Sequence, residues 1–227
     1  MDQSLTRRAL IGAGLALPIL ALPGCASGLG RFGFEDAIRR LLTLSSQRAF
    51  ARLLTDEGFF RDDVARIPLP EQLGGSRVTN ALAALLGTSL VQDRLLRLVN
   101  RAAADAAEEA APIVYDSIRG MSIADAVSIV RGGSTAATDY LQRSMGNAIV
   151  DAMFPGVGQA LRLFDNGVVN QLVRLATGFD FNRLQRHVAQ AAANGIYRAI
   201  GREEGAVRAD PGATGDPVLT GVFALGR

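Results

Sequence analysis

A serine, an aspartate and the single histidine follow one another in the order used by α/β-hydrolases, as Ser134, Asp180 and His187. A nucleophile elbow needs a strand before the serine and a glycine two residues after it. Here a helical pattern precedes Ser134, and Ala136 stands where that glycine belongs. We therefore interpret Gly132-Gly133 as the end of one helix and Ser134 as the N-cap of the next, with His187 on a helix surface. No catalytic residue is predicted, and we expect that the protein is not an enzyme.

Three carboxylates lie on one face of a predicted helix, with Asp105, Glu109 and Asp116 at i, i+4 and i+11. Such a line of oxygen ligands suits a hard cation such as calcium. No second acidic segment converges on it, and Arg101 can pair with Asp105 one turn away. We therefore expect a solvated face and no metal site. Because the chain has one histidine and one cysteine, the usual structural zinc site is excluded, and no cofactor is predicted.

Polar residues of the same predicted helix lie on either side of Pro112 and are weak candidates for lining a cleft: Asn100, Arg101, Tyr115 and Asp116. An enzyme would need such groups to converge, whereas Arg101 suits an interhelical ion pair equally well. Further along the chain, Gly156-Val157-Gly158 lacks the preceding strand that a dinucleotide-binding loop requires. We expect a turn at these glycines and no bound nucleotide.

The first 25 residues have the pattern of a bacterial lipoprotein signal. Arg7 and Arg8 supply positive charge, and the apolar run 9–22 is too short for a membrane-spanning helix, which needs about 20 residues. The run ends at Leu22-Pro23-Gly24-Cys25, which holds the only cysteine of the chain. We expect a signal peptide over 1–24, attachment to membrane lipid at Cys25 and a short tether over 25–33.

Two alternatives stay open at this N-terminus. Pro23 departs from the small or aliphatic residue usual two places before a lipobox cysteine, as would suit an ordinary cleaved secretory signal. Arg7-Arg8 also resembles a twin-arginine motif, so the export route is either that one or the general secretory route. We expect an exported protein at the periplasmic face of a membrane, the outer membrane if the cell is Gram-negative.

The charge balance is close to neutral. The chain has 24 basic residues, all arginine, and 22 acidic ones. Removal of residues 1–24 takes away Asp2, Arg7 and Arg8, which leaves 22 against 21 and a net charge of +1. This balance gives no electrostatic footprint for nucleic acid, which we exclude as a partner. Without a second cysteine, the fold must depend on packing rather than on a disulfide.

Helical periodicity covers almost all of residues 34–227, which predicts one all-α domain, a bundle of about six to seven helices. The longest expected helix is kinked or broken near Pro112 and carries a seam of mostly small residues. The seam consists of Leu96, Val99, Ala103, Ala106, Ala110, Ile113 and Ser117. Other helices are expected over about 34–57, 70–86, 134–153, 159–176 and 182–208, with a capping start at Ser122–Asp125 and a turn-rich break over 211–217.

Several blocks of the chain, taken in order, resemble the DUF4197 family, bacterial envelope proteins of unknown function. The blocks are Ile67–Glu71, Asn100–Ala103, Ala110–Ile113, Met121 with Asp125-Ala126, Gly132-Gly133 with Ala136–Tyr140, Phe179-Asp180, Glu203-Glu204, Arg208 and Asp210-Pro211. The likeness covers roughly residues 30–227 and is weakest at His187–Ala193, Gly201 and Gly205. It implies an all-helical exported domain and brings no activity or catalytic residue.

These observations favour a non-catalytic envelope lipoprotein that presents a helical interaction surface to an envelope protein partner. The alternative is a carrier or sensor of an apolar or lipid ligand held between helices. A contiguous apolar pocket of a few hundred cubic ångströms would favour the carrier, and a solid core would favour the interaction protein. An enzyme is the third hypothesis, and it would require polar groups such as Arg101, Tyr115 or Asp116 to meet in a cleft. The oligomeric state is left open.

Overall fold

A computed structural model describes residues 31–69, 88–163 and 181–224. The predicted all-α fold is confirmed, since these residues form eight α-helices and one 3-10 helix, with no strand among them. The elements are α1 (Arg31–Leu53), α2 (Gly58–Arg61), α4 (Ser89–Gly120), α5 (Ala126–Arg131), α6 (Ala136–Met145), α7 (Ala148–Leu163), α9 (Phe181–Ala209), η2 (Pro211–Thr214) and α10 (Pro217–Ala224).

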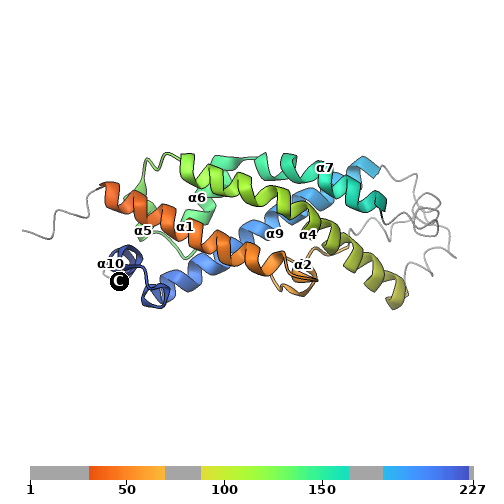
Figure 1. Cartoon of the computed structure of the whole chain (residues 1–227), viewed down its shortest axis with the longest axis horizontal. Coiled ribbons are helices and arrows are strands. Elements are labelled where there is room, and N and C mark those ends of the chain that lie inside the picture. Colours follow the sequence, from red (N-terminus) through yellow and green to blue (C-terminus); the bar gives the residue numbers. More distant parts are fainter. Residues whose placement is uncertain (1–30, 70–87, 164–180, 225–227) are drawn as a thin grey trace, which may run out of the picture.

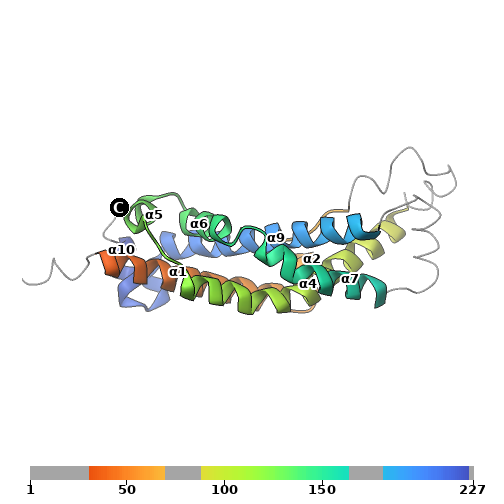
Figure 2. The same ribbon diagram turned by 90° about the horizontal axis from the view of Figure 1, so that it is seen from above.

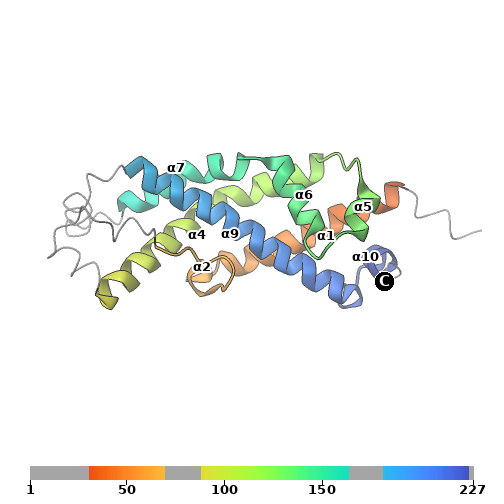
Figure 3. The ribbon, with the colours of Figure 1, turned by 180° about the vertical axis from the view of Figure 1, so that it is seen from behind.

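Four long helices form an elongated bundle (Figure 1). The most extensive contacts are those of α4 with α7 and of α1 with α9. Helix α9 lies behind α1 and α4 (Figure 2) and crosses the bundle diagonally from α7 toward α10 (Figure 3). The short helices α5 and α10 gather at the end where α1 begins, so the first turn of α1 and the C-terminal helix lie at the same end of the bundle.

The expected small-residue seam is the buried face of α4. Val99, Ala103, Ala106 and Ala110 are buried as predicted. Beyond Ala110 the buried stripe continues through Val114 and Ile118, not through Ile113 and Ser117, which are only half-buried. Each step of four residues turns the stripe by about 40°, because an α-helix has 3.6 residues per turn, so the buried stripe winds gradually around α4 toward its C-terminus.

The expected turn at Gly156-Val157-Gly158 is wrong, because these residues lie inside α7. A Cβ atom added to Gly156 would lie 3.3 Å from the Cα atom of Ala106, and one added to Gly158 would lie 2.4 Å from Nε2 of Gln185. The glycines therefore lie where α7 approaches Ala106 of α4 and the side chain of Gln185 of α9, and not in a turn. The expected long helix also continues through Pro112 without a break, since α4 extends from Ser89 to Gly120.

Three helix boundaries differ from those predicted. Helix α1 begins at Arg31, inside the tether expected over 25–33. The N-cap of α5 is Asp125 rather than Ser122, and its Oδ1 accepts a hydrogen bond from the backbone N–H of Ser128 at 3.3 Å. The helix expected over 134–153 is divided into α6 and α7 at Gly146, whose φ of 53° suits glycine.

Other predicted features lie outside the described residues. These are the signal peptide over 1–24 with Arg7 and Arg8, the lipid attachment residue Cys25, the helix expected over 70–86, the end of the helix expected over 159–176, and Asp180. After the turn-rich break expected over 211–217, the described chain ends in helix α10. None of the described helices is both long and apolar enough to span a membrane.

Candidate functional site

Glu204 is fully buried in α9, and its carboxylate closes the N-terminus of α6. One oxygen accepts the backbone N–H of Ala137 at 3.0 Å; the other accepts the backbone N–H of Thr138 at 2.7 Å and its hydroxyl at 2.6 Å. The first N–H groups of a helix lack intrahelical partners and carry partial positive charge, so a carboxylate suits this position. Glu204 is thus an N-cap supplied by another helix.

Arg208 completes this arrangement one turn further along α9. Its Nε donates to Glu204 at 2.8 Å, and its two Nη atoms donate to the carbonyls of Ile129 at 3.0 Å and Val130 at 2.9 Å. These carbonyls belong to the last turn of α5, where a cation is favourable. We call Glu204 and Arg208 the α9 clasp, because together they join α5, α6 and α9.

A second buried carboxylate ties α9 to the turn after α2. Asp62 accepts two hydrogen bonds from the guanidinium of Arg202, at 3.0 and 2.6 Å, and two from the backbone N–H groups of Val64 and Ala65, at 3.0 and 2.9 Å. Burial alone would raise the pKa of Asp62, but Arg202 and the two amides outweigh it and hold that pKa below its ordinary value.

The buried side chain of Asn100 on α4 holds the extended segment that follows α2. Its Oδ1 accepts the backbone N–H of Ile67 at 2.8 Å, and its Nδ2 donates to the Ile67 carbonyl at 3.0 Å and to the Leu96 carbonyl at 2.8 Å. The amide therefore satisfies both backbone groups of Ile67, as a strand partner would.

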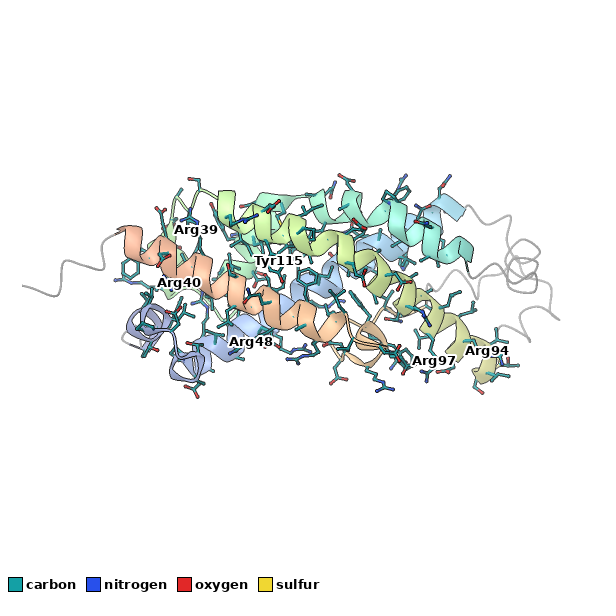
Figure 4. All side chains as sticks on the ribbon, in the orientation of Figure 1. Arg39, Arg40, Arg48, Arg94, Arg97 and Tyr115 are labelled. Atoms are coloured by element: carbon teal, nitrogen blue, oxygen red, sulfur yellow. The ribbon has the colours of Figure 1, made fainter. Side chains whose placement is uncertain are left out.

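A groove of about 490 Å³ lies between the end of α1, α2 and the outer face of α4. We call it the α2–α4 groove. Its apolar lining residues are Leu54, Phe60, Leu98 and Ala104. Its charged ones are Asp56, Glu57, Arg94, Arg97, Arg101, Asp105 and Glu108. Arg94 and Arg97 project from the same edge of α4 (Figure 4).

Phe60 and Glu57, which line this groove, are each contacted by two arginines. The guanidinium carbons of Arg97 and Arg66 lie 4.2 and 4.5 Å from the centre of the Phe60 ring. Glu57 binds Arg97 and, at 2.8 Å, Arg61, and these hydrogen bonds lower the pKa of the Glu57 carboxyl. The result is an exposed cluster in which aromatic and apolar groups are interspersed with both signs of charge.

A second groove, of about 580 Å³, lies along α6 and α9 and is lined by Ser134, Gln142, Tyr197 and Arg198 among others. The Tyr197 hydroxyl is buried without a hydrogen-bond partner among the described residues, and burial raises the pKa of Tyr197 to about 12. The phenol is therefore neutral at physiological pH. Ser134, which also lines this groove, was predicted to be the N-cap of the following helix, and this prediction is wrong. Thr135 occupies the N-cap position of α6, and the carboxylate of Glu204 accepts the free N–H groups.

Ser134 and His187 are not brought together. A Cβ atom added to Gly205 would lie 3.7 Å from the Cβ of Ser134, which places the serine beside the C-terminal half of α9. His187 lies eighteen residues earlier on α9, or about 27 Å at 1.5 Å per residue. The histidine is exposed, as predicted.

A family model for a protein of unknown function, DUF4197, matches residues 29–224. The chain belongs to this family. Neither the curated proteins nor the solved structures contain a match to the chain. Four residues of the blocks that resemble DUF4197 make hydrogen bonds between segments far apart in the sequence: Asn100, Glu203, Glu204 and Arg208. Glu203, for example, accepts a hydrogen bond from Arg52 of α1 at 2.6 Å.

The four residues predicted to line a cleft near Pro112 do not form one. Asn100 and Arg101 line the α2–α4 groove, whereas Tyr115 packs edge-on against Phe50 of α1, with ring centres 6.0 Å apart. Asp116 is exposed and binds Arg119. The two pairs of residues are separated by about 20 Å of helix, since Tyr115 lies fourteen residues after Arg101 and each residue adds 1.5 Å. Proximity to a proline was not a sufficient reason to group them.

Proposed function

We propose that this chain is a non-catalytic lipoprotein of the cell envelope whose helical domain presents an interaction surface to a protein partner. The observation that carries the proposal is the use made of the buried polar side chains. Glu204, Asp62 and Asn100 each hydrogen-bond to distant parts of the fold, so their polar atoms hold helices together. The exposed charges of the α2–α4 groove are, by contrast, accessible to a partner.

The groove and the proposed anchor lie in different parts of the bundle. Cys25 is six residues before Arg31, so an acyl chain on it would hold the start of α1 within about 20 Å of the bilayer. The α2–α4 groove is beside α2, at the end of α1 remote from Arg31 (Figure 1). A domain anchored in this way would offer the groove to partners in the periplasm.

An interaction protein suits the interior of the bundle better than a carrier does. Between α4 and α7 the space is closed by the approach of Gly156 to Ala106. The two large grooves are open and partly lined by arginines, such as Arg97 and Arg198, rather than closed and apolar. These features favour a surface function over storage of an apolar ligand.

The anchor is tested by replacing its cysteine. In cells that express the chain, Cys25→Ala should move the protein from the membrane fraction to the soluble periplasmic fraction, and globomycin should cause unprocessed parent protein to accumulate. Cys25→Ala protein that stays with the membrane at unchanged mobility would overturn the lipoprotein part of the proposal.

The absence of catalysis is tested separately. The purified Cys25→Ala chain should not react with a fluorophosphonate probe, because Ser134 is about 27 Å along α9 from the level of His187. Labelling of Ser134 that disappears in His187→Ala would place the protein among hydrolases.

A further inference from the structure

The outer face of α4 changes sign along its length. Arg94, Arg97 and Arg101 come first, and Asp105 and Glu108 follow at the same helical spacing of three and four residues. All five line the α2–α4 groove, so they share one face of the helix. This face, which we call the α4 charge stripe, is positive toward the N-terminus of α4 and negative toward its middle.

The α4 charge stripe is symmetric about Arg101. Arg94 lies seven residues before it and Glu108 seven after; Arg97 lies four before and Asp105 four after. If a second copy of α4 is placed antiparallel, with its own Arg101 at the same level, every other arginine of the stripe faces a carboxylate of the other copy. Such pairing is electrostatically complementary in both directions at once.

The apolar members of the same face follow the same rule. Leu98 lies three residues before Arg101 and Ala104 three after, so a large side chain would face a small one. Leu90 and Pro112 lie eleven residues before and after, and Leu90 is 64% exposed. Helix α4 also extends beyond α2 at its N-terminal end (Figures 1 and 3), so this part of its face is not covered by α2.

All five charged residues of the stripe are exposed to solvent. Arg94, Asp105 and Glu108 are exposed, and within the part of the chain that the structure describes they have no ion-pair partner. Arg97 binds Asp93 and Glu57 on its own chain but remains 46% exposed.

We propose that two copies of this chain associate through the α4 charge stripe, with antiparallel α4 helices and a two-fold axis at Arg101. The arrangement is isologous, as in most homodimers, because the same surface is used by both copies. This dimer names a second copy of the chain as the partner for the proposed interaction surface. The inference rests on that part of the proposed function and is independent of the lipid anchor. The two Arg101 side chains meet at the axis, where Asp105 of each copy lies one turn away and offsets their repulsion.

One like-charged pair remains in this register. Asp93 and Glu109 lie eight residues before and after Arg101, and both are acidic. Neither lines the α2–α4 groove, so they lie at the flank of the contact, where solvent and salt screen their repulsion. The dimer itself should weaken as ionic strength rises, because its pairs are partly solvated.

Charge reversal tests the register. In the purified Cys25→Ala chain, light scattering and sedimentation should show a dimer. Glu108→Arg and Arg94→Glu should each raise the Kd at least about tenfold, because each substitution creates two like-charged contacts per dimer. The double variant Arg94→Glu with Glu108→Arg should restore the Kd to within about threefold of the parent, because the pairs are re-formed with exchanged signs. Asp116→Arg, an equal change of charge on α4 outside the groove, should leave the Kd unchanged.

A cross-link tests the axis. In the Cys25→Ala chain, Arg101→Cys introduces the only thiol, and mild oxidation should produce a disulfide-linked dimer, since only a residue on the axis faces its own copy. Arg119→Cys, near the other end of α4, should form no disulfide-linked dimer and should run as a monomer on a denaturing gel without reducing agent. A chain that is monomeric at 100 μM, a dimer indifferent to Glu108→Arg, or equal cross-linking at both positions would overturn the proposal. Because these measurements use the Cys25→Ala chain, they are independent of whether Cys25 is acylated.

Discussion

The α9 clasp and the α2–α4 groove use the same chemical groups, arginines and carboxylates, for opposite purposes. Glu204 and Arg208 have side chains that are 0% and 10% exposed, whereas Arg97 and Glu57 of the groove are 46% and 27% exposed. In the clasp, the carboxylate has four hydrogen-bond donors drawn from two helices. In the groove, water competes for every charge. Burial therefore decides whether a pair holds the fold together or remains available to a partner.

The energetic difference follows from solvation. Removing one partner of a buried pair leaves a charge without water and without compensation, which is strongly destabilising. Exposed ion pairs add little to the free energy of unfolding, because water stabilises the separated charges almost as well as the contact does. Stability measurements should thus separate the two regions, while association measurements should respond only to the groove.

The largest effect is expected at the clasp. Glu204→Gln replaces one oxygen by an NH₂ group that faces backbone donors, and it leaves Arg208 buried without a counter-charge. We expect a loss of about 3–5 kcal/mol in the free energy of unfolding, measured by urea denaturation of the Cys25→Ala chain. Glu108→Gln in the groove is the matched control; in protein diluted below the Kd of the proposed dimer, it should leave the urea midpoint nearly unchanged. If the two variants were equally stable, the contrast between the regions would be wrong.

An intermediate, pH-dependent effect is expected at Asp62. Asp62→Asn should destabilise the protein by about 1–3 kcal/mol at pH 7, because it weakens bonds to a guanidinium and two amides. The pKa of Asp62 is lower in the folded than in the unfolded protein, so the stabilisation is complete above the ordinary Asp value of about 3.9 and is lost as the pH falls through the lower folded value. Urea midpoints of parent and variant should therefore converge below about pH 4. A gap that stays constant down to pH 3 would show that charge is not the cause.

The smallest effect is expected at the exposed cluster around Phe60. Arg97→Gln removes a cation from Glu57, Asp93 and the ring, all of which are accessible to water. The melting temperature of dilute protein, followed by circular dichroism, should fall by at most about 2 °C. A larger fall would mean that the groove holds the fold together in the same way as the clasp.

Local periodicity was sufficient for the parts of the fold that depend on neighbours in sequence. The seam from Val99 to Ala110 was predicted correctly because burial on α4 repeats with the helical period. The clasp could not be found in this way, since Glu204 and the helix it caps are 66–67 residues apart. Ser134 was favoured as the cap because it is the local candidate, and no sequence pattern shows that a carboxylate from another helix occupies the site.

Glycine and polar residues were misjudged for a related reason. Gly156 is expected in a turn because glycine is common there, but it lies within α7 at a close approach to Ala106 of α4, which only the packed helices determine. Asn100 is expected beside Tyr115 and Asp116 in a cleft near Pro112, whereas it lines the α2–α4 groove and pairs with Ile67, 33 residues away. The available signal was a single amide, Asn100, beside an alanine-rich helix face. A buried amide needs hydrogen-bond partners, and backbone groups can supply them.

The contact between α1 and α9 has a consequence for the order of events during synthesis. Arg52 and Glu203, which join these helices, are 151 residues apart. At about 5–20 residues per second, α9 leaves the ribosome roughly 8–30 s after α1, so the first helix is made long before its main partner. Throughout that interval α1 can contact α2, α4, α5 and α6, but its main partner, α9, has not yet been made. The surface of α1 that packs against α9 therefore stays uncovered until α9 has been synthesised, and the bundle can be completed only after that.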